Sequence, residues 1–340
     1  MKALVIEAPN MVEIRDVEEP KIGPHDVLIK VKMVGIHPQD YYMTKDLIVQ
    51  GHKISPIPHI PGEEVAGIVE KVGDQVKNLK KEDKVIIYHR IHDGTCDMCI
   101  LGNEQLCRNG GRFGINANGG LAEYIAVPER NVIKIPEEIS WEVAASLPAS
   151  ALTPYHALNK AGLRAGEYLV VFGASGNTGI FAVQLGKIFG GIVIAVSRKN
   201  RSWLKEFGAD YLVNLDTVEE EVKEISKGRM ADVVIDSVGV ATWNKSLRVV
   251  GTLGRWATFG ALTGGEFNEE FVKISPIYLY RFERALIGVR GGKKSELYTL
   301  INLASKLKVR IWRKFKLEEA LRALEAIVSP ERDGRVFVEV

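Results

Sequence analysis

The sequence predicts an α/β protein of two domains, in which a doubly wound parallel sheet is inserted into a mainly antiparallel β domain. Short strand-like segments fill the chain to about residue 130, and from residue 141 strands alternate with helices. The chain of 340 residues also exceeds what one hydrophobic core usually supports. We therefore expect one domain to comprise residues 1–140 and 275–340, and a second to comprise residues 141–274.

The N-terminal part has the hydrophobic pattern of strands with one buried face. Within residues 27–33, apolar residues recur at every second position, which is typical of such strands. Comparable runs occupy residues 65–69, 84–88 and 122–127. Turn-forming residues such as Gly73 and Asp74 separate the runs. This pattern predicts a mainly antiparallel sheet.

From residue 141 the pattern changes to apolar strands separated by helices. An alanine-rich helix is expected over residues 141–158 and a strongly charged helix over residues 218–226. The expected strands cover residues 168–172, 192–196, 211–213, 233–236 and 252–258. Such alternation indicates a parallel sheet covered by helices on both faces. The C-terminal helix at 317–327 and alternating strand at 336–340 return to the first pattern, which indicates an insertion.

Composition and charge exclude several classes of protein. The hydrophobic fraction of 46% and the charged fraction of 26% are ordinary for a folded domain. A net charge of +2 predicts no nucleic-acid or membrane partner, and no apolar run approaches the length of a membrane helix. The N-terminus leads directly into a strand-like segment without a signal-peptide cleavage site. We expect a cytoplasmic protein that acts on a small molecule.

A glycine-rich turn lies between an expected strand and an expected helix. It consists of Gly173, Ala174, Ser175, Gly176, Asn177, Thr178 and Gly179. Glycines at this spacing allow a sharp turn and let a pyrophosphate approach the helix N-terminus, where amide groups and the helix dipole stabilise negative charge. The turn therefore predicts a dinucleotide site. The alternative is a tight turn whose glycines serve packing alone.

The end of the next expected strand bears on the choice of cofactor. An acidic residue about 20 positions after the glycines would bind the ribose 2′-hydroxyl of NAD. Here the residues are Ser197, Arg198 and Lys199, a small side chain and two cations. They suit a 2′-phosphate and predict NADP rather than NAD. The alternative is that both cations only face solvent.

All three cysteines of the chain lie close together beside an acidic residue. The spacing of Asp93, Cys96, Cys99 and Cys107 allows three thiolates and one carboxylate to complete a tetrahedron around zinc. Such a site has no open coordination position, so we expect a structural zinc in a loop of the β domain. The alternative is three free cysteines, with Asp93 as an ordinary turn residue.

Together these features resemble the medium-chain dehydrogenase/reductase superfamily, which includes zinc alcohol dehydrogenases and quinone or enone reductases. Besides the zinc-loop spacing and the glycine turn, the matching segments are residues 34–40, 60–67, 72–73, 82–85, 152–155, 236–239 and 334–336. The resemblance implies a GroES-like domain that holds the substrate site and an inserted Rossmann domain. It also implies that Thr153 and Val238 contact the cofactor, and that the protein is a homodimer or homotetramer.

Departures from the family pattern bear on the chemistry. The resemblance implies catalytic zinc ligands at three positions, which are occupied here by His37, Glu63 and about Ala149. Alanine cannot bind a metal, and a carboxylate at position 63 replaces an imidazole. We therefore expect an NADPH-dependent reductase of quinones, enones or other activated carbonyls, with structural zinc only. The first alternative is an alcohol dehydrogenase whose atypical zinc uses His37 and Glu63 with Glu64 or Asp40. A second alternative is a non-enzymatic NADPH-binding protein.

The metal-free quinone reductases of this superfamily have an Asn, an Asp and a Tyr in the loop that contains His37. The resemblance matches these three to His37, Asp40 and Tyr42. Tyr42 or His37 is then the group that donates a proton or hydrogen bond to the substrate oxygen. Asp40 is expected to orient the loop. The alternatives are a buried His37 satisfied by the backbone and a Tyr42 that only packs.

Overall fold

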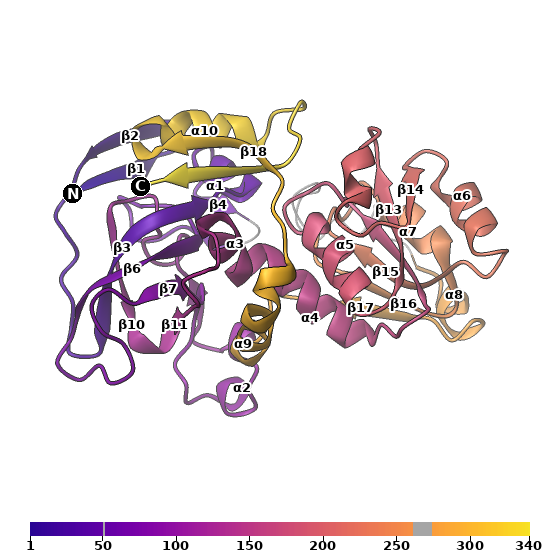
Figure 1. Cartoon of the computed structure of the whole chain (residues 1–340), viewed down its shortest axis with the longest axis horizontal. Coiled ribbons are helices and arrows are strands. Elements are labelled where there is room, and N and C mark those ends of the chain that lie inside the picture. The colour runs from indigo at the N-terminus through magenta and orange to yellow at the C-terminus, as the bar shows by residue number, and fades with distance from the viewer. Residues whose placement is uncertain (50–51, 261–273) are drawn as a thin grey trace. The chain divides into compact units, whose positions relative to one another are not determined.

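The computed structural model describes residues 1–49, 52–260 and 274–340, and the chain forms two compact units (Figure 1). Unit 1 comprises Met1–Ala149 and Lys293–Val340, and unit 2 comprises Ser150–Gly292. Unit 1 contains a mainly antiparallel sheet and unit 2 a parallel sheet with helices. The predicted α/β fold class is confirmed.

The borders of the units differ from the predicted borders. The sequence pattern placed them at residues 140/141 and 274/275, whereas the units change at residues 149/150 and 292/293. The first border falls within continuous helical backbone, formed by α3 (Trp141–Ser146), a π-helical turn (Leu147–Ala151) and α4 (Leu152–Ala161). A change of hydrophobic pattern marks where this helical segment begins. It does not mark the residue at which the segment stops packing on unit 1 and starts packing on unit 2. The second border is later because α8 (Pro276–Tyr280) and β17 (Ala285–Gly288) complete unit 2.

The main sheet of unit 1 has seven strands among the described residues, with the order β11-β7-β6-β3-β19-β18 and with β10 also paired to β3. These strands are β3 (Asp26–Gly35), β6 (Glu64–Val72), β7 (Lys84–Ile87), β10 (Tyr124–Pro128), β11 (Val132–Lys134), β18 (Ile311–Lys316) and β19 (Arg335–Glu339). Three two-stranded sheets lie outside the main sheet and pair β1 (Lys2–Ala8) with β2 (Met11–Asp16), β4 (Ile48–Val49) with β5 (His52–Lys53), and β8 (Arg90–Ile91) with β9 (Gly111–Arg112). The strands paired to β3 and β7 run antiparallel, and β18 runs parallel to β19.

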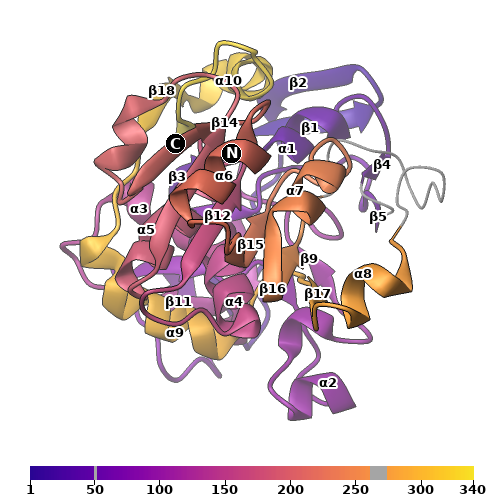
Figure 2. The same ribbon diagram turned by 90° about the vertical axis from the view of Figure 1, so that its right-hand side faces the viewer.

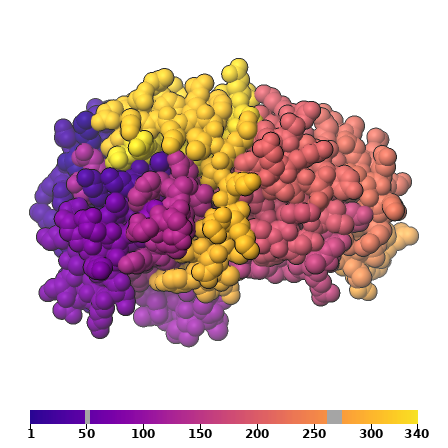
Figure 3. Space-filling model, viewed as in Figure 1, coloured from indigo at the N-terminus to yellow at the C-terminus, as the bar shows by residue number. Residues whose placement is uncertain are grey.

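Helices cover the sheet of unit 1 and explain why β3 is more buried than its alternation predicts. Helix α10 (Ala320–Ile327) packs on β18 and β19, and further α-helices of unit 1 are α1 (Pro38–Met43), α2 (Asp97–Ile100) and α9 (Lys294–Leu303). Leu28 and Val34 are buried as well as Val27, Ile29 and Val31, because α3 packs on β3 and β6. Figure 3 shows the C-terminal residues of unit 1 against its N-terminal strands, and Lys2 pairs there with Glu318 at 2.7 Å.

The sheet of unit 2 has six parallel strands among the described residues, in the order β14-β13-β12-β15-β16-β17. Besides β17, they are β12 (Tyr168–Phe172), β13 (Ile192–Ser197), β14 (Tyr211–Asn214), β15 (Ala231–Asp236) and β16 (Val250–Thr258). Besides α8, the helices between them in the described residues are α5 (Gly179–Ile188), α6 (Val218–Ile225) and α7 (Trp243–Val249). Helix α4 packs with α5, and α6 packs with α7 (Figure 2). The strand order reverses between β12 and β15, which is where ligands bind in sheets of this kind.

None of the helices in the described ranges combines the length and the apolar character that crossing a membrane requires. The core of unit 2 is formed by its strands: Val170, Phe172, Ile194, Val196 and Val234 are all at most 1% exposed. This near-complete burial agrees with the predicted apolar runs, because helices cover both faces of a parallel sheet.

Candidate functional site

The glycine-rich turn joins β12 to α5, as the sequence predicts. Strand β12 ends at Phe172 and α5 begins at Gly179. The Gly176 amide donates to the Gly173 carbonyl oxygen at 2.8 Å, which closes the turn. A Cβ atom at Gly179 would overlap the same carbonyl oxygen, so this position tolerates no side chain. The seven residues Gly173, Ala174, Ser175, Gly176, Asn177, Thr178 and Gly179 thus surround the N-terminus of α5, where a pyrophosphate can bind.

We expect replacement of Gly179 by alanine to weaken dinucleotide binding about tenfold or more, since the new methyl group would displace the backbone that approaches the pyrophosphate. Calorimetric titration with NADPH measures the effect. Gly288→Ala is the matched control, because a Cβ there would meet nothing within 4 Å. Wild-type affinity in Gly179→Ala would contradict the assignment of the turn.

The residues that follow β13 lie at the same edge of the sheet as the turn. Parallel register aligns Phe172 at the end of β12 with the ends of β13 and β15. Ser197 is half-buried at this edge, and Arg198 and Lys199 are exposed. Thr153 lies elsewhere, on α4, and is half-buried. The edge therefore presents two cations close to the predicted nucleotide turn.

Asp236 organises the loop after β15, a role that the sequence did not reveal. Its fully buried carboxylate accepts hydrogen bonds from the amides of Val238 at 2.8 Å and Gly239 at 3.0 Å. It also accepts hydrogen bonds from the hydroxyls of Thr242 and Ser246. These bonds fix the loop that contains Val238, one of the predicted cofactor contacts. The sequence feature that could have indicated this role is an acidic residue, Asp236, at the end of an apolar strand and shortly before a glycine, Gly239.

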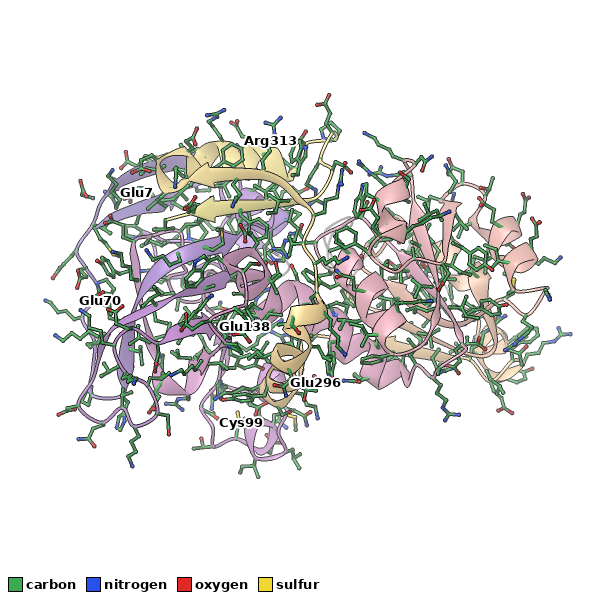
Figure 4. All side chains as sticks on the ribbon, viewed as in Figure 1. Glu7, Glu70, Cys99, Glu138, Glu296 and Arg313 are labelled. Atoms are coloured by element: carbon green, nitrogen blue, oxygen red, sulfur yellow. The ribbon has the colours of Figure 1, made fainter. Side chains whose placement is uncertain are left out.

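Four potential metal ligands lie together in the segment between β8 and β9, which we call the zinc loop (residues 93–107). They are Asp93, Cys96, Cys99 and Cys107, and their ligand atoms all lie within 4.8 Å of one another. The Sγ atom of Cys96 lies 3.6 Å from that of Cys99 and 3.8 Å from that of Cys107. Figure 4 shows Cys99 in this loop. The predicted spacing therefore brings all four residues to one point.

The zinc loop fits a tetrahedral zinc ion. With Zn–S bonds of about 2.3 Å, thiolate sulfurs around such an ion lie about 3.8 Å apart. Hydrogen bonds from the backbone amides of Cys96 and Thr95 hold the pKa of Asp93 well below its usual range, so that its carboxylate is ionised. Four protein ligands leave no position for substrate, and the site is structural.

His37 lies at the start of α1, where it meets a buried carboxylate. Its Nε2 atom is 3.1 Å from Oε2 of Glu64, and its side chain is 12% exposed. Burial by itself lowers the pKa of His37, but the charge and hydrogen bond of Glu64 outweigh burial and the net pKa is raised. The structure therefore favours a protonated imidazole with an accessible edge.

Glu64 is held between two cationic groups. It is fully buried and forms an ion pair with Arg335, whose side chain is 1% exposed, as well as with His37. Burial acts to raise the pKa of Glu64, but Arg335 and His37 outweigh it and lower the pKa to about 2. A Cβ atom at Gly35 would overlap this ion pair, so a glycine there allows β3 to pass close to it.

Glu63 forms a second buried ion pair. Its Oε2 atom lies 3.6 Å from the guanidinium of Arg112, and both side chains are almost fully buried. Burial acts to raise the pKa of Glu63, but the charges of His89 and Arg112 outweigh it and the pKa is lowered. Because burial lowers the pKa of His89 to about 3, its ring is neutral near pH 7, and the arginines Arg112 and Arg90 supply positive charge near Glu63. The sequence alone did not indicate that Arg112 or Arg335 belongs to this group of charged residues.

Asp40 and Tyr42 occupy the two sides of α1. Asp40 is fully buried, and its Oδ2 atom accepts a hydrogen bond from the His37 backbone amide at 2.7 Å. Burial raises the pKa of Asp40 to about 7. Tyr42 is 41% exposed and packs edge-on against Tyr41, with ring centroids 5.6 Å apart. Asp40 thus anchors the backbone of His37, while the Tyr42 hydroxyl is accessible.

Comparison with known families matches both units. Residues 23–137 match the alcohol dehydrogenase GroES-like domain, and residues 178–306 match the zinc-binding dehydrogenase domain. An NAD-dependent alcohol dehydrogenase of Sulfolobus acidocaldarius is 32% identical, with 100% of both chains covered. The chain belongs to the medium-chain zinc-containing alcohol dehydrogenase family. This dehydrogenase is therefore an oxidoreductase that uses a nicotinamide cofactor and has a cysteine-rich structural zinc site.

Two other similar proteins illustrate the range of the family. A thermostable alcohol dehydrogenase from Pyrobaculum aerophilum has a similar structure, with a TM-score of 0.91, 37% identity and coverage of 100% of this chain and 99% of that chain. An acryloyl-coenzyme A reductase of Sulfurisphaera tokodaii is 28% identical over 100% of both chains. The alcohol dehydrogenase names favour the alternative interpretation of the sequence over the quinone or enone reductase that we placed first.

A catalytic zinc does not fit at the positions where the family resemblance implies one. Glu63 is paired with Arg112, and the His37–Glu64 pair is completed by Arg335, so fixed cations already neutralise both carboxylates. Among the described residues, the zinc loop is the one group of three or more such ligands close enough to hold a metal. The dehydrogenase therefore has the structural zinc ligands, but His37 and Glu63 do not form a fitting set for a second zinc.

Proposed function

We propose that this dehydrogenase interconverts alcohols with aldehydes or ketones, and that the reacting centre works without a metal. The alcohol dehydrogenase names of similar proteins support the substrate class. The ion pair of His37 with Glu64 is the observation that carries the chemistry, since it provides a proton donor where the family resemblance implies a zinc ligand. In this proposal unit 2 binds the nucleotide and unit 1 supplies the acid.

Reduction of a carbonyl group adds a hydride to carbon and a proton to oxygen. When bound, the nicotinamide supplies the hydride. His37 supplies the proton, because the Glu64 carboxylate favours its protonated ring and its side chain is accessible. In the reverse direction the neutral ring accepts the proton of the alcohol. A cationic imidazole stabilises negative charge on the substrate oxygen, so the site favours reduction when His37 is protonated.

The side chains around His37 position it. Glu64 orients the imidazole and is itself fixed by Arg335, while Asp40 fixes the His37 backbone through a hydrogen bond of 2.7 Å. All three of these side chains are fully or almost fully buried. Tyr42, which is exposed on the same helix as Asp40, supplies a hydroxyl as a second group that can donate a hydrogen bond to the substrate oxygen.

A second candidate function is reduction of an activated carbon–carbon double bond. The acryloyl-coenzyme A reductase among the similar proteins favours it, as does the unsuitable ligand set for a catalytic zinc. Such a reaction needs the same two parts, a hydride for the β-carbon and a proton for the carbonyl side. His37 serves as the acid in both candidates.

Product analysis with 2-cyclohexen-1-one and NADPH separates the two candidates. Carbonyl reduction gives 2-cyclohexen-1-ol and alkene reduction gives cyclohexanone, which gas chromatography resolves. We expect the allylic alcohol as the main product, together with cyclohexanol from cyclohexanone as substrate. Cyclohexanone as the main product would establish the second candidate. Binding of NADPH without turnover of these probes, benzaldehyde or 1,4-benzoquinone would favour a non-enzymatic protein.

The preference for NADP is part of the proposal. Arg198 and Lys199 follow β13 with no acidic residue at its end. A cavity of ≈ 590 Å³ beside this strand end is lined by the cations Lys199, Arg201 and Lys205, and also by Ser197, Asp210 and Glu221 among other residues. Cations in such a cavity favour a 2′-phosphate, which a ribose hydroxyl cannot replace.

We expect the double substitution Arg198→Ala and Lys199→Ala to raise the KM for NADPH about tenfold or more, because charge-assisted contacts to the 2′-phosphate are lost. The KM for NADH should change little, since NADH has no such phosphate. Steady-state kinetics with both cofactors measures the two values. Equal changes for NADH and NADPH would show that the cations do not select the cofactor.

A further inference from the structure

We propose that Arg112 is a positioning residue, held against Glu63 by a two-stranded ribbon that the zinc loop closes. The ribbon consists of β8 and β9, which enter and leave the zinc loop. The proposal rests on the proposed function only in taking His37 as the proton donor. In this proposal the zinc loop holds the ribbon in place, and the ribbon in turn holds Arg112 beside Glu63, whose charge acts on His37.

The ribbon is short and depends on what closes it. Arg90 pairs with Arg112 and Ile91 with Gly111, so each strand contributes only two residues. At the loop end, the Gly110 amide donates to the Cys107 carbonyl oxygen at 3.2 Å, which places a metal ligand directly beside the ribbon. Such a short pair of strands is marginal by itself, and the long loop between the strands costs entropy to close. A metal bound by the four ligands removes most of that cost.

The ribbon positions the Arg112 side chain beside the buried carboxylate of Glu63. Arg112 is 6% exposed, with its guanidinium 3.6 Å from Glu63 and 3.4 Å from the side-chain oxygen of Gln39. Arg90, opposite Arg112 on the ribbon, adds a second positive charge near Glu63. A buried carboxylate stays ionised only while such cations remain close. Displacement of the ribbon would therefore raise the pKa of Glu63 and favour its neutral form.

The charge of Glu63 reaches His37. Among the described residues, the charged groups around the imidazole include Glu64 at the start of β6, Glu63 directly before it, Asp40 on α1 and Arg335 on β19. Among them, Glu64 and Glu63 raise the pKa of His37 against the effect of burial, and Arg335 lowers it. Neutralisation of Glu63 would remove one of the negative charges that raise the pKa of His37. Arg112 thus acts on the proton donor through Glu63.

Titration of the His37 ring by NMR tests this connection without turnover. The chain has seven histidines, and the His37→Gln variant assigns the resonance. In the zinc-loaded Arg112→Met variant we expect the pKa of His37 to fall by about 0.5–1 pH unit, because Glu63 loses its cation. Removal of zinc should shift the pKa in the same direction. Arg108→Met is the matched control: Arg108 is an exposed arginine of the same segment that pairs with Asp97, and its loss should change nothing.

A second disturbance of the ribbon leaves every metal ligand in place. In Gly110→Ala, the new Cβ would lie 2.8 Å from the Ile91 carbonyl oxygen and 3.0 Å from the Cβ of Cys107. Zinc content and circular dichroism establish that this variant binds zinc and is folded. It therefore tests the ribbon even if removal of zinc unfolds the zinc loop. We expect its His37 pKa to fall as in Arg112→Met.

Three results would overturn the proposal. The first is an unchanged His37 titration in Arg112→Met. The second is a shift in Arg112→Met that neither Gly110→Ala nor zinc removal reproduces, since the ribbon would then not hold the arginine. The third is an equal shift in Arg108→Met. Absence of turnover with every probe would contradict the proposed function but would leave this titration valid.

Discussion

Replacement of Arg335 by methionine is expected to lower the free energy of unfolding by about 3–5 kcal/mol, one of the two largest effects that the structure predicts. Arg335 is 1% exposed and pairs with the fully buried Glu64. Without the guanidinium, the buried carboxylate would lose the cation that lowers its pKa most. Urea denaturation of the two proteins at pH 7 measures the loss.

The free energy of unfolding of Arg335→Met should change with pH in the opposite direction from that of the wild type. In the wild type, Arg335 and His37 overcome burial and lower the pKa of Glu64 to about 2, whereas an unfolded glutamate titrates at about 4.3. The pair therefore stabilises the fold above pH 4.3, and this contribution is lost as the pH falls towards 2. In Arg335→Met burial dominates, so stability should rise as the pH is lowered from 7 to 5.

Two controls separate the ion pair from a general effect of losing an arginine. Arg313 lies on the neighbouring strand β18 and is exposed, as Figure 4 shows, so Arg313→Met should change stability by less than about 0.5 kcal/mol. Glu64→Gln in the Arg335→Met background should recover part of the loss, since no buried charge remains at position 64. A loss in Arg335→Met no larger than in Arg313→Met would contradict the proposed importance of this pair.

The second large effect concerns catalysis. We expect His37→Gln to lower kcat for carbonyl reduction about 10²–10⁴-fold, the usual contribution of a positioned acid. KM should change little, because glutamine preserves the size and polarity of the side chain. Steady-state kinetics with cyclohexanone and NADPH gives both constants.

The pH profile identifies the donor. The pKa of His37 is raised, with the Glu64 carboxylate outweighing burial, so kcat for reduction should be full below this pKa and fall as the pH rises through it. The His37→Gln profile should be flat over the same range. Tyr42→Phe is the matched test of the other candidate donor, and we expect it to keep the wild-type profile. If His37→Gln kept the pH dependence of kcat and Tyr42→Phe abolished it, Tyr42 would be the proton donor.

Local features of the sequence predicted the scaffold well. The glycine turn and the cysteine cluster each depend on residues within about 15 positions, and backbone geometry forces such neighbours together. The zinc loop accordingly has all four predicted ligands within 4.8 Å. The border between the units was predicted less well, because it lies inside continuous helix.

The charges around His37 could not be predicted because they depend on distant partners. Glu64 and Arg335 are 271 residues apart and meet only because β19 pairs with β3, which also pairs with β6. Arg112 reaches Glu63 from the far end of the zinc loop. In sequence, Glu63 and Glu64 are two adjacent acids with metal-binding potential. In the structure, each is neutralised by an arginine.

The metal content of the purified chain tests the central claim most directly. We predict one equivalent of zinc per chain by plasma mass spectrometry, lost or weakened in Cys99→Ser and unchanged in His37→Ala and Glu63→Ala. Two equivalents, one of them lost in His37→Ala or Glu63→Ala, would contradict the account and establish a catalytic zinc at the His37 site.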